Sequence, residues 1–329
     1  MSINNLPDDA ISIQNLSKKF KNPNGKGFFY ALDDITLSIP RGSIFGLLGP
    51  NGAGKSTFIN ILAGLTIKTS GDACVWGNDI DKNPKAARSS LGVVPQELTI
   101  DPFFTPRESL EQQAGLYGVR PKDRNIDYIL RMLDLEDKAE AYSRTLSGGM
   151  RRRLLVAKAM VHRPPILILD EPTAGVDIEL RVQLWNYVRK LNENGTTIIL
   201  TTHYLEEAEE LCDKIAILDK GKIVKSSSKK DLLEDAESKT ISLKVREIPD
   251  LNHPILSNLG AIINENKDVL INFNPKIINS REILAKVEQA GIVPYDFDVT
   301  GASLETVFLS ITQKPVSYTH LRAHETKSY

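Results

Sequence analysis

Long apolar runs are missing from this sequence of 329 residues. The longest apolar stretches, such as Ile166–Leu169 and Ile215–Leu218, have the length of a strand, whereas a membrane-spanning helix needs about 20 apolar residues. The segment Met1–Ala10 is polar and acidic, and it lacks the apolar core of a signal peptide. We therefore expect a chain that neither crosses a bilayer nor is exported, and that stays in the cytoplasm.

Cysteine is scarce, and neither sign of charge dominates. Cys74 and Cys212 have no CxxC spacing and no His cluster beside them, so we expect reduced structural thiols rather than a metal site. The 41 basic residues nearly balance the 42 acidic ones, so no long-range field draws the chain to nucleic acid or to anionic lipid. Any link to a membrane should therefore be made through a protein partner.

The first part of the chain, up to about Thr201, alternates short β-branched runs with amphipathic segments of helix length. This alternation is typical of a largely parallel sheet flanked by helices. Between Glu97 and Thr145 only helical patterns occur, so we expect a helical insertion into the α/β core at about residues 97–160. The expected strands are Ile11–Leu16, Ile35–Ile39, Ile44–Leu48, Ala73–Trp76, Gly92–Pro95, Ile166–Leu169 and Thr197–Thr201, followed by a hairpin of Ile215–Leu218 and Lys222–Lys225.

A polar run, Ser226–Lys230, marks the expected linker between two domains at residues 1–225 and 226–314. Beyond it the patterns follow the order of a split βαββαβ sandwich, with a further helix at the end. The expected elements are Thr240–Val245, Leu251–Leu259, Ala261–Ile263, Val269–Phe273, Ser280–Ala290, Tyr295–Val299 and Ser303–Ile311. Residues 315–329 resemble translated sequencing adaptor, and we expect this tail to be non-native.

A glycine-rich segment follows the expected strand Ile44–Leu48 and opens an expected helix, Ser56–Leu62. It fits the pattern GxxxxGK followed by Ser or Thr, in which backbone N–H groups wrap a chain of phosphates and the helix N-terminus adds positive potential. Lys55 would reach the β- and γ-phosphates of ATP, and Ser56 would offer its hydroxyl to Mg²⁺. The expected nucleotide-binding residues of this phosphate loop are Gly49, Pro50, Asn51, Gly52, Ala53, Gly54, Lys55, Ser56 and Thr57.

Two adjacent carboxylates end the apolar strand Ile166–Leu169. Asp170 is suited to hold Mg²⁺ through water, and Glu171 can orient or deprotonate an attacking water. A strand that merely reaches solvent often ends in an acid as well. The phosphate loop upstream favours the functional interpretation, with one carboxylate for the metal and the next for water.

The segment LSGGM at residues 146–150 precedes an expected long helix, Arg151–Val161. Its glycines expose backbone donors at a helix start, which is a second phosphate-binding terminus in a domain with one nucleotide. A second phosphate-binding helix start makes sense if the segment covers the nucleotide held by another copy. A plain turn followed by a helix cap has the same sequence pattern. We expect Arg151, Arg152 and Arg153 to form a solvated, partly packed face rather than a nucleic-acid patch.

In their order along the chain, these motifs resemble the ATP-binding subunit of the ABC transporter superfamily, over Ile11 to about Lys225. The resemblance implies an α/β fold: a P-loop NTPase core with a mostly parallel sheet, an antiparallel β subdomain and a helical insertion, joined here to a small α+β C-terminal domain. It implies that Gln96 contacts Mg²⁺ and the attacking water, and that His203 contacts the γ-phosphate, so that both act with Glu171 in catalysis. It assigns Asp177 to the loop between two active sites, and it assigns the γ-phosphate across a dimer interface to Ser147, Gly148 and Gly149.

The aromatic residue that stacks on adenine stays open between several candidates. The family places it shortly before the second strand, where Phe20 fits, and we prefer that residue. The insertion at residues 22–27 is followed by Phe28, Phe29 and Tyr30, and each of these is an alternative. Aromatic residues that do not stack on the base are expected to pack in the core.

Three segments, at residues 146–154, 201–209 and 302–309, resemble the bacterial exporter branch of the superfamily. The branch implies a homodimer, or a heterodimer of paralogues, that closes over two MgATP molecules and drives export through integral membrane permease subunits. Such a subunit lies on the inner face of the plasma membrane, and its permease would dock near Pro102–Tyr117.

Two other functions compete with transport. A soluble ABC ATPase that acts on nucleic acid or ribosomes usually has tandem domains or a long coiled-coil insertion, and the sequence shows neither. A P-loop kinase or GTPase would lack the LSGGM segment and His203. The expectation is therefore an ATP-hydrolysing transport subunit, with its cargo undetermined.

Overall fold

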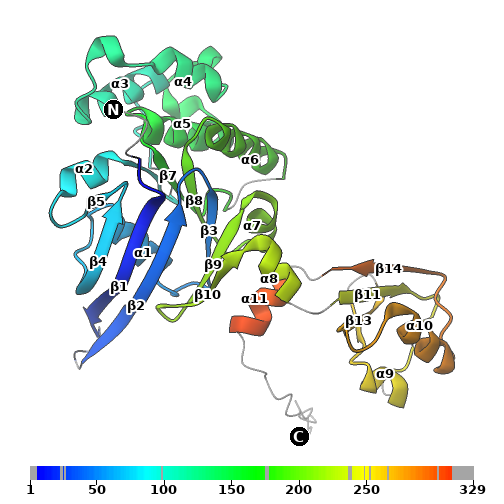
Figure 1. Cartoon of the computed structure of the whole chain (residues 1–329). Coiled ribbons are helices and arrows are strands. Elements are labelled where there is room, and N and C mark those ends of the chain that lie inside the picture. Colours follow the sequence, from blue (N-terminus) through cyan, green and yellow to red (C-terminus); the bar gives the residue numbers. More distant parts are fainter. Residues whose placement is uncertain are drawn as a thin grey trace, which may run out of the picture. The chain divides into compact units, whose positions relative to one another are not determined.

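The computed structural model describes residues 6–22, 25, 27–97, 99–174, 178–235, 239–247, 249–251, 253–264, 267–301 and 304–312. The chain divides into two compact units, Met1–Lys229 and Lys230–Tyr329 (Figure 1). The tail at 315–329 and Asp177 lie outside the described residues. Among the helices that are described, none is both long enough and apolar enough to span a membrane.

A six-stranded sheet forms the centre of the first unit, with the order β10-β9-β3-β8-β7-β6. The five strands from β9 to β6 are parallel, and β10 turns back antiparallel to β9. Strands β3 and β8 are buried along their whole length, which explains their nearly continuous apolar sequence and confirms the expected mostly parallel sheet. The bounds are β3 Ile44–Leu48, β6 Leu91–Val94, β7 Ile166–Asp170, β8 Thr197–Thr202, β9 Lys214–Asp219 and β10 Lys222–Ser228.

A second, antiparallel sheet has four strands in the order β2-β1-β4-β5. They are β1 Asp9–Lys21, β2 Phe28–Pro40, β4 Ser70–Val75 and β5 Asn78–Asp79. The hairpin of β1 and β2 is much longer than the sequence predicted, because its distal end is exposed and lacks the alternating buried apolar residues that mark a strand. This sheet is the antiparallel subdomain that the resemblance implied.

One core cluster joins the two sheets. Helix α1, Lys55–Leu62, contributes Phe58 and Leu62 to it, beside buried residues of β1, β2, β3 and β4. The other described helices of this unit outside the insertion are α2 Pro84–Ser89, α6 Ile178–Glu193 and α7 Leu205–Leu211, and α8 Lys229–Asp235 begins at the last residue of the unit. Both cysteines are free thiols, and burial raises the pKa of Cys212.

The described chain between β6 and β7 is helical, as expected for the insertion. It contains α3 Pro106–Leu116, α4 Ile126–Met132 and α5 Gly148–Met160, with short 3₁₀ turns between them. Helix α3 begins with a capping box: the Thr105 hydroxyl accepts from the Glu108 N–H, and the Glu108 carboxylate accepts from the Thr105 N–H. Helices α3 and α4 pack against α5, so α5 links the insertion to the sheet.

We predicted a solvated arginine face after the LSGGM segment, and this prediction was wrong for Arg152 and Arg153. Arg152 and Arg153 are only 5% and 9% exposed, and both donate to main-chain carbonyls of neighbouring segments. A run of three charges in sequence gives no sign of the carbonyl groups that packing places around it, and buried carbonyls need such donors.

The second unit is a sandwich of one antiparallel sheet and its helices. Its sheet has the order β12-β13-β11-β14, and its strands and helices follow one another in the order βαββαβ, with a further helix at the end. Helix α9 starts later than expected because His253 caps it and Pro254 occupies its first position. The bounds are β11 Lys239–Lys244, α9 Pro254–Asn258, β12 Ile262–Ile263, β13 Val269–Phe273, α10 Ser280–Gln289, β14 Asp296–Thr300 and α11 Leu304–Thr312.

Candidate functional site

The phosphate loop leaves the carboxyl end of β3 and enters α1. A Cβ at Gly49 would lie 2.3 Å from the carbonyl oxygen of Leu218, and one at Gly54 would lie 2.4 Å from that of Ala31. Gly54 also has a φ of 116°, which side-chain-bearing residues rarely adopt. The loop therefore packs its backbone directly against β9 and β2, and only glycine permits this approach.

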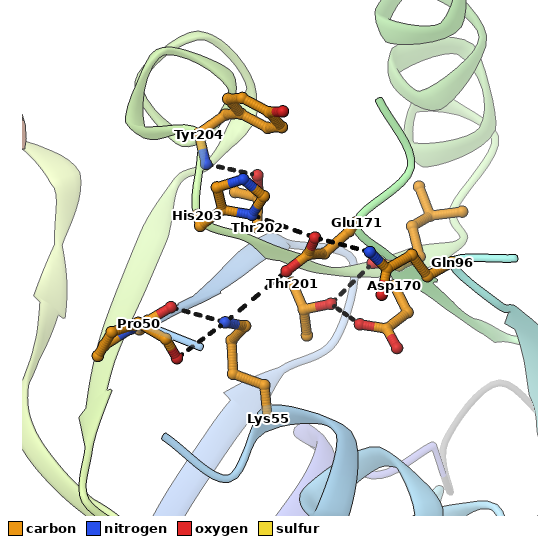
Figure 2. Close-up of polar contacts among 11 residues, drawn as sticks. Pro50, Lys55, Gln96, Asp170, Glu171, Thr201, Thr202, His203 and Tyr204 are labelled. Atoms are coloured by element: carbon orange, nitrogen blue, oxygen red, sulfur yellow. Dashed lines mark hydrogen bonds and ion pairs between the residues drawn. The ribbon is translucent and has the colours of Figure 1, made fainter. Parts of the chain in front are cut away.

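Lys55 is the first residue of α1 and is 6% exposed. Its Nζ donates to the carbonyl oxygens of Gly49 at 2.6 Å and Pro50 at 3.3 Å, and it lies 3.9 Å from Oε1 of Glu171 (Figure 2). Burial lowers the pKa of Lys55, and the carboxylates of Glu171 and Asp170 oppose this shift. A buried ammonium at the start of a helix is a strong binding point for phosphate oxygens.

Glu171 lies at the centre of the polar contacts in Figure 2. It is 7% exposed, and its φ of 46° is in the left-handed region, where the N–H still donates to the Thr201 carbonyl at 2.9 Å. Its Oε2 accepts from Nε2 of Gln96 at 3.2 Å and lies 3.1 Å from Nδ1 of His203. A strained backbone held in this way is typical of functional positions.

Asp170 has a different partner from its neighbour. The hydroxyl of Thr201, on the adjacent strand β8, donates to Oδ1 of Asp170 at 2.5 Å. Because successive side chains of a strand point to opposite sides, the two adjacent carboxylates are held by separate groups. This separation allows one carboxylate to serve a metal while the next one serves water.

The carboxyl ends of neighbouring parallel strands bring the polar residues together. Lys55 follows β3, His203 follows β8, Glu171 follows β7 and Gln96 follows β6, and these four strands are adjacent in that order. Sites in parallel α/β sheets form at this edge. Four segments that are far apart in the sequence thus meet around one carboxylate.

An open pocket of about 760 Å³ lies over this edge. The phosphate loop lines it from Pro50 to Thr57, together with Gln96, Glu171 and His203. The β1–β2 hairpin adds Phe20, Phe29 and Tyr30, and the rings of Phe20 and Phe29 have centroids 5.9 Å apart. Phe28 is not part of the described lining and is 66% exposed, so three of the four aromatic candidates reach the pocket.

The LSGGM segment is not part of this pocket. Ser147 caps α5, where its Oγ accepts from the Met150 N–H at 3.2 Å. Ser147 and Gly148 are exposed, Gly149 is buried, and none of the three is among the described residues that line the pocket. A Cβ at Gly148 would meet nothing within 4 Å, so the helix start faces open space.

Sequence reasoning missed two side chains that support the site, Thr201 and Thr202. Thr201 holds Asp170, and Oγ1 of Thr202 accepts from the N–H of Tyr204 at 2.9 Å, which shapes the turn that carries His203. Both threonines are fully buried. The signal was present, because two hydroxyl residues end an apolar strand directly before a histidine, and buried hydroxyls need partners.

The donor set of the site fits Mg²⁺. This ion prefers oxygen ligands and is usually held by one or two carboxylates, waters and the phosphates of a substrate. The Asp170 carboxylate, the Gln96 amide oxygen and the exposed hydroxyl of Ser56 are ligands of that kind. Thr201 orients the carboxylate by engaging one of its oxygens.

Comparison with known proteins identifies the family of the chain. The family model described as ABC transporter matches residues 32–174. The daunorubicin/doxorubicin resistance ATP-binding protein DrrA of Streptomyces peucetius is 34% identical over 322 residues, which cover 95% of this chain and 95% of that protein. The Nod factor export ATP-binding protein I of Ralstonia nicotianae is 39% identical over 225 residues, which cover 68% of each chain.

Solved structures agree with the sequence relatives. The dimeric structure of a post-hydrolysis state of the ATP-binding cassette MJ0796, bound to ADP and Pi, is 27% identical and has a TM-score of 0.58, covering 66% of this chain and 98% of that chain. With a relative matched along nearly its whole length, the chain belongs to the ABC transporter family, as an ATP-hydrolysing, ATP-binding subunit of the drug-resistance and export branch.

Proposed function

We propose that two copies of this subunit close head to tail over two MgATP molecules and drive export through separate membrane subunits. One observation carries this conclusion: the pocket contains Lys55, Glu171 and His203, whereas the LSGGM helix start is exposed and lies outside it. A second copy would bring its own helix start over the open pocket. A two-fold interface makes each contact twice, so both pockets would be completed together. The dimeric relative bound to ADP and Pi supports this arrangement.

In the completed site, the residues divide the chemistry between them. Backbone N–H groups of the phosphate loop and Lys55 bind the β- and γ-phosphates, and Glu171, oriented by Gln96, takes a proton from the attacking water. Lys55 and His203 stabilise the negative charge on the γ-phosphoryl group as the bond to ADP breaks. Mg²⁺, held by Ser56, Gln96 and Asp170, supplies charge neutralisation when bound.

The dimer contacts follow from the same geometry. Ser147, Gly148 and Gly149 would bind the γ-phosphate held by the other copy, through the N–H groups at the start of α5. Asp177 would lie in the loop between the two sites. Loss of the γ-phosphate removes the bridge between the copies, so hydrolysis reopens the dimer and delivers the mechanical step.

A groove between the sheet and the helical insertion suits the membrane partner. This docking groove has a volume of about 320 Å³ and is lined by apolar and polar residues of α1, β6 and α5, with Tyr117 at the end of α3. Leu65, in its lining, and Leu116, beside Tyr117, are each 77% exposed. We propose that a cytoplasmic helix of the permease covers these side chains, which locates the subunit at the inner face of the plasma membrane. The relatives named for drug resistance and Nod factor export support export as the direction of transport.

The three aromatic residues that line the pocket, Phe20, Phe29 and Tyr30, form an aromatic platform that allows a test of nucleotide binding. Phe20→Ala is expected to weaken ATP binding roughly 5- to 150-fold, because loss of an aromatic stack on a base costs about 1–3 kcal/mol. Phe28→Ala is the matched control, since this ring lies outside the described pocket lining. The affinity of the Phe28→Ala protein for ATP should stay within about twofold of that of the parent. Isothermal titration calorimetry with ATP measures both. A larger loss in Phe29→Ala or Tyr30→Ala would transfer the stacking role to that residue.

Mixing inactive variants tests whether sites are shared. Ser147→Arg and Lys55→Ala should each be inactive alone, but in a mixed dimer both defects fall on one site and the other site is intact. An equimolar mixture forms about half mixed dimers, so ATPase activity should return to up to about a quarter of the parental rate.

The control mixture combines Lys55→Ala with Glu171→Gln. Both residues lie in the pocket of their own chain, so every site of the mixed dimer carries a defect and no activity should return. Equal recovery in the two mixtures, or no recovery in the first despite mixed dimers shown by native mass spectrometry, would refute the shared site.

A further inference from the structure

Arg152 is a buried cation with an unusual set of partners. It lies in the second turn of α5, is 5% exposed, and donates from Nη1 to the carbonyl oxygens of Pro95 at 3.2 Å and Gln96 at 2.9 Å. Burial lowers the pKa of its guanidinium, and the buried carboxylate of Glu207 opposes that shift. A buried guanidinium that donates from one nitrogen to two loop carbonyls holds that loop in position relative to the helix.

The loop in question carries a residue of the catalytic site. Gln96 is held at both ends: its main-chain carbonyl accepts from Arg152, and its side-chain amide donates to Oε2 of Glu171 at 3.2 Å. A shift of the Arg152 guanidinium would therefore move the group that orients Glu171. The two hydrogen bonds form a continuous path from α5 to the carboxylate.

The other end of the path lies at the LSGGM segment. Arg152 is five positions after Ser147, which is the N-cap of the 13-residue helix α5 that contains Arg152. A helix of this length moves as a rigid element, so displacement of its N-terminus also displaces the guanidinium. In the proposed head-to-tail dimer, Ser147 contacts the nucleotide of the other copy, whereas Gln96 orients Glu171 at the nucleotide of its own copy.

We propose that Arg152 is a positioning residue that couples the two nucleotide sites, by carrying movement of α5 at one nucleotide to Gln96 at the other. This inference rests on the proposed dimer. It identifies one side chain through which closure over the first ATP prepares the second site for hydrolysis. The path consists of hydrogen bonds between packed elements, and breaking it should reduce cooperativity between the sites.

Arg153 offers a matched comparison on the same helix. It is also buried, at 9% exposure, and it also donates to two carbonyls, those of Leu133 at 3.0 Å and Asp134 at 2.9 Å. These carbonyls lie at the end of α4 rather than in the Gln96 loop, and Arg153 also forms an ion pair with the Asp134 carboxylate at 2.8 Å and donates to the Tyr187 hydroxyl of α6 at 3.3 Å. Replacing it removes a buried cation and leaves unpaired carbonyls, as at Arg152, but leaves the path to Glu171 intact.

The test measures ATPase rate against ATP concentration for the parent, Arg152→Met and Arg153→Met. The parent should show a Hill coefficient approaching about 2, the limit for two sites, and Arg152→Met should fall to about 1. The kcat of Arg152→Met should drop roughly 2- to 30-fold, the range in which single residues alter coupling. Arg153→Met should keep the parental Hill coefficient, although its thermal midpoint should fall.

A double-mutant cycle separates coupling from general destabilisation. If Arg152 acts through Gln96, Arg152→Met should change kcat less than about twofold in a Gln96→Ala background, because the two residues then share one effect. Independent, multiplying losses would mean that Arg152 only supports packing, and they would overturn the inference. Equal loss of cooperativity in Arg153→Met would overturn it as well.

Folding and dimerisation are controlled separately. If Arg152→Met does not fold, Arg152→Lys replaces it, since the shorter ammonium keeps the charge but falls short of both carbonyls, and its Hill coefficient should also fall. An unchanged Hill coefficient in the folded Lys variant contradicts the coupling. A parent that is itself non-cooperative, with a rate per chain that does not rise with protein concentration, would instead refute the proposed dimer.

Discussion

Glu171→Gln is expected to bind ATP and to form a stable nucleotide-dependent dimer, while ATP turnover falls roughly 10²–10⁴-fold. The substitution keeps the size of the side chain and one oxygen acceptor for the Gln96 amide, so the pocket should keep its shape. It removes the only charge that Glu171 contributes, and with it the group that accepts a proton from water. The γ-phosphate then persists as a bridge between the two copies.

Size-exclusion chromatography with and without ATP measures the dimer, and phosphate release measures turnover. Glu193→Gln, the same chemical change at the exposed end of α6, is the control and should match the parent in both assays. A Glu171→Gln protein that stays monomeric with ATP, or that hydrolyses at the parental rate, would show that Glu171 is not the base.

Lys55→Ala should lose nucleotide binding itself. Its ammonium is buried, is held by the carbonyls of Gly49 and Pro50, and lies at the start of α1, where phosphate oxygens would meet it. Breaking a buried, hydrogen-bonded charge pair costs about 2–5 kcal/mol, so the Kd for ATP should rise roughly 30-fold to several thousand-fold. The loss should be larger than that of any variant in the aromatic platform.

Calorimetry with ATP gives this Kd directly. Lys85→Ala, which removes an exposed lysine of α2, should bind ATP like the parent and controls for the change in net charge. Thermal unfolding without nucleotide should show that Lys55→Ala is folded, because the buried Glu171 carboxylate loses its contact with Lys55 but keeps its contacts with Gln96 and His203. Unchanged ATP affinity would remove Lys55 from the phosphate site.

Much of the site could be predicted because its chemistry is encoded over short distances in the chain. The phosphate loop needs glycines, a lysine and a hydroxyl residue at fixed spacing between a strand and a helix, and the structure has β3 and α1 at those places. Asp170 ends the buried strand β7 and Glu171 follows it, which places both at the carboxyl edge of the sheet. The fold class was equally accessible, since alternating apolar runs and amphipathic segments determine the parallel sheet.

Other features could not be predicted, because they depend on which segments meet. Nothing near Phe20, Phe28, Phe29 or Tyr30 in the sequence says which rings reach the pocket, since that depends on the register of the long hairpin. The arginine run was misjudged for a similar reason. Its burial depends on carbonyl groups that come from the end of β6 and from the end of α4.

The sequence by itself determined the family and the nucleotide chemistry, and it gave the residues proposed to carry that chemistry, because local spacing sets the backbone conformation around each motif. Only the tertiary structure decided how these motifs are combined: it gathers Gln96, His203 and Lys55 around Glu171, leaves the LSGGM helix start outside the pocket, and buries Arg152 against the Gln96 loop. The reason is physical, since burial and hydrogen bonding between segments far apart in the chain are properties of their packing rather than of either segment alone.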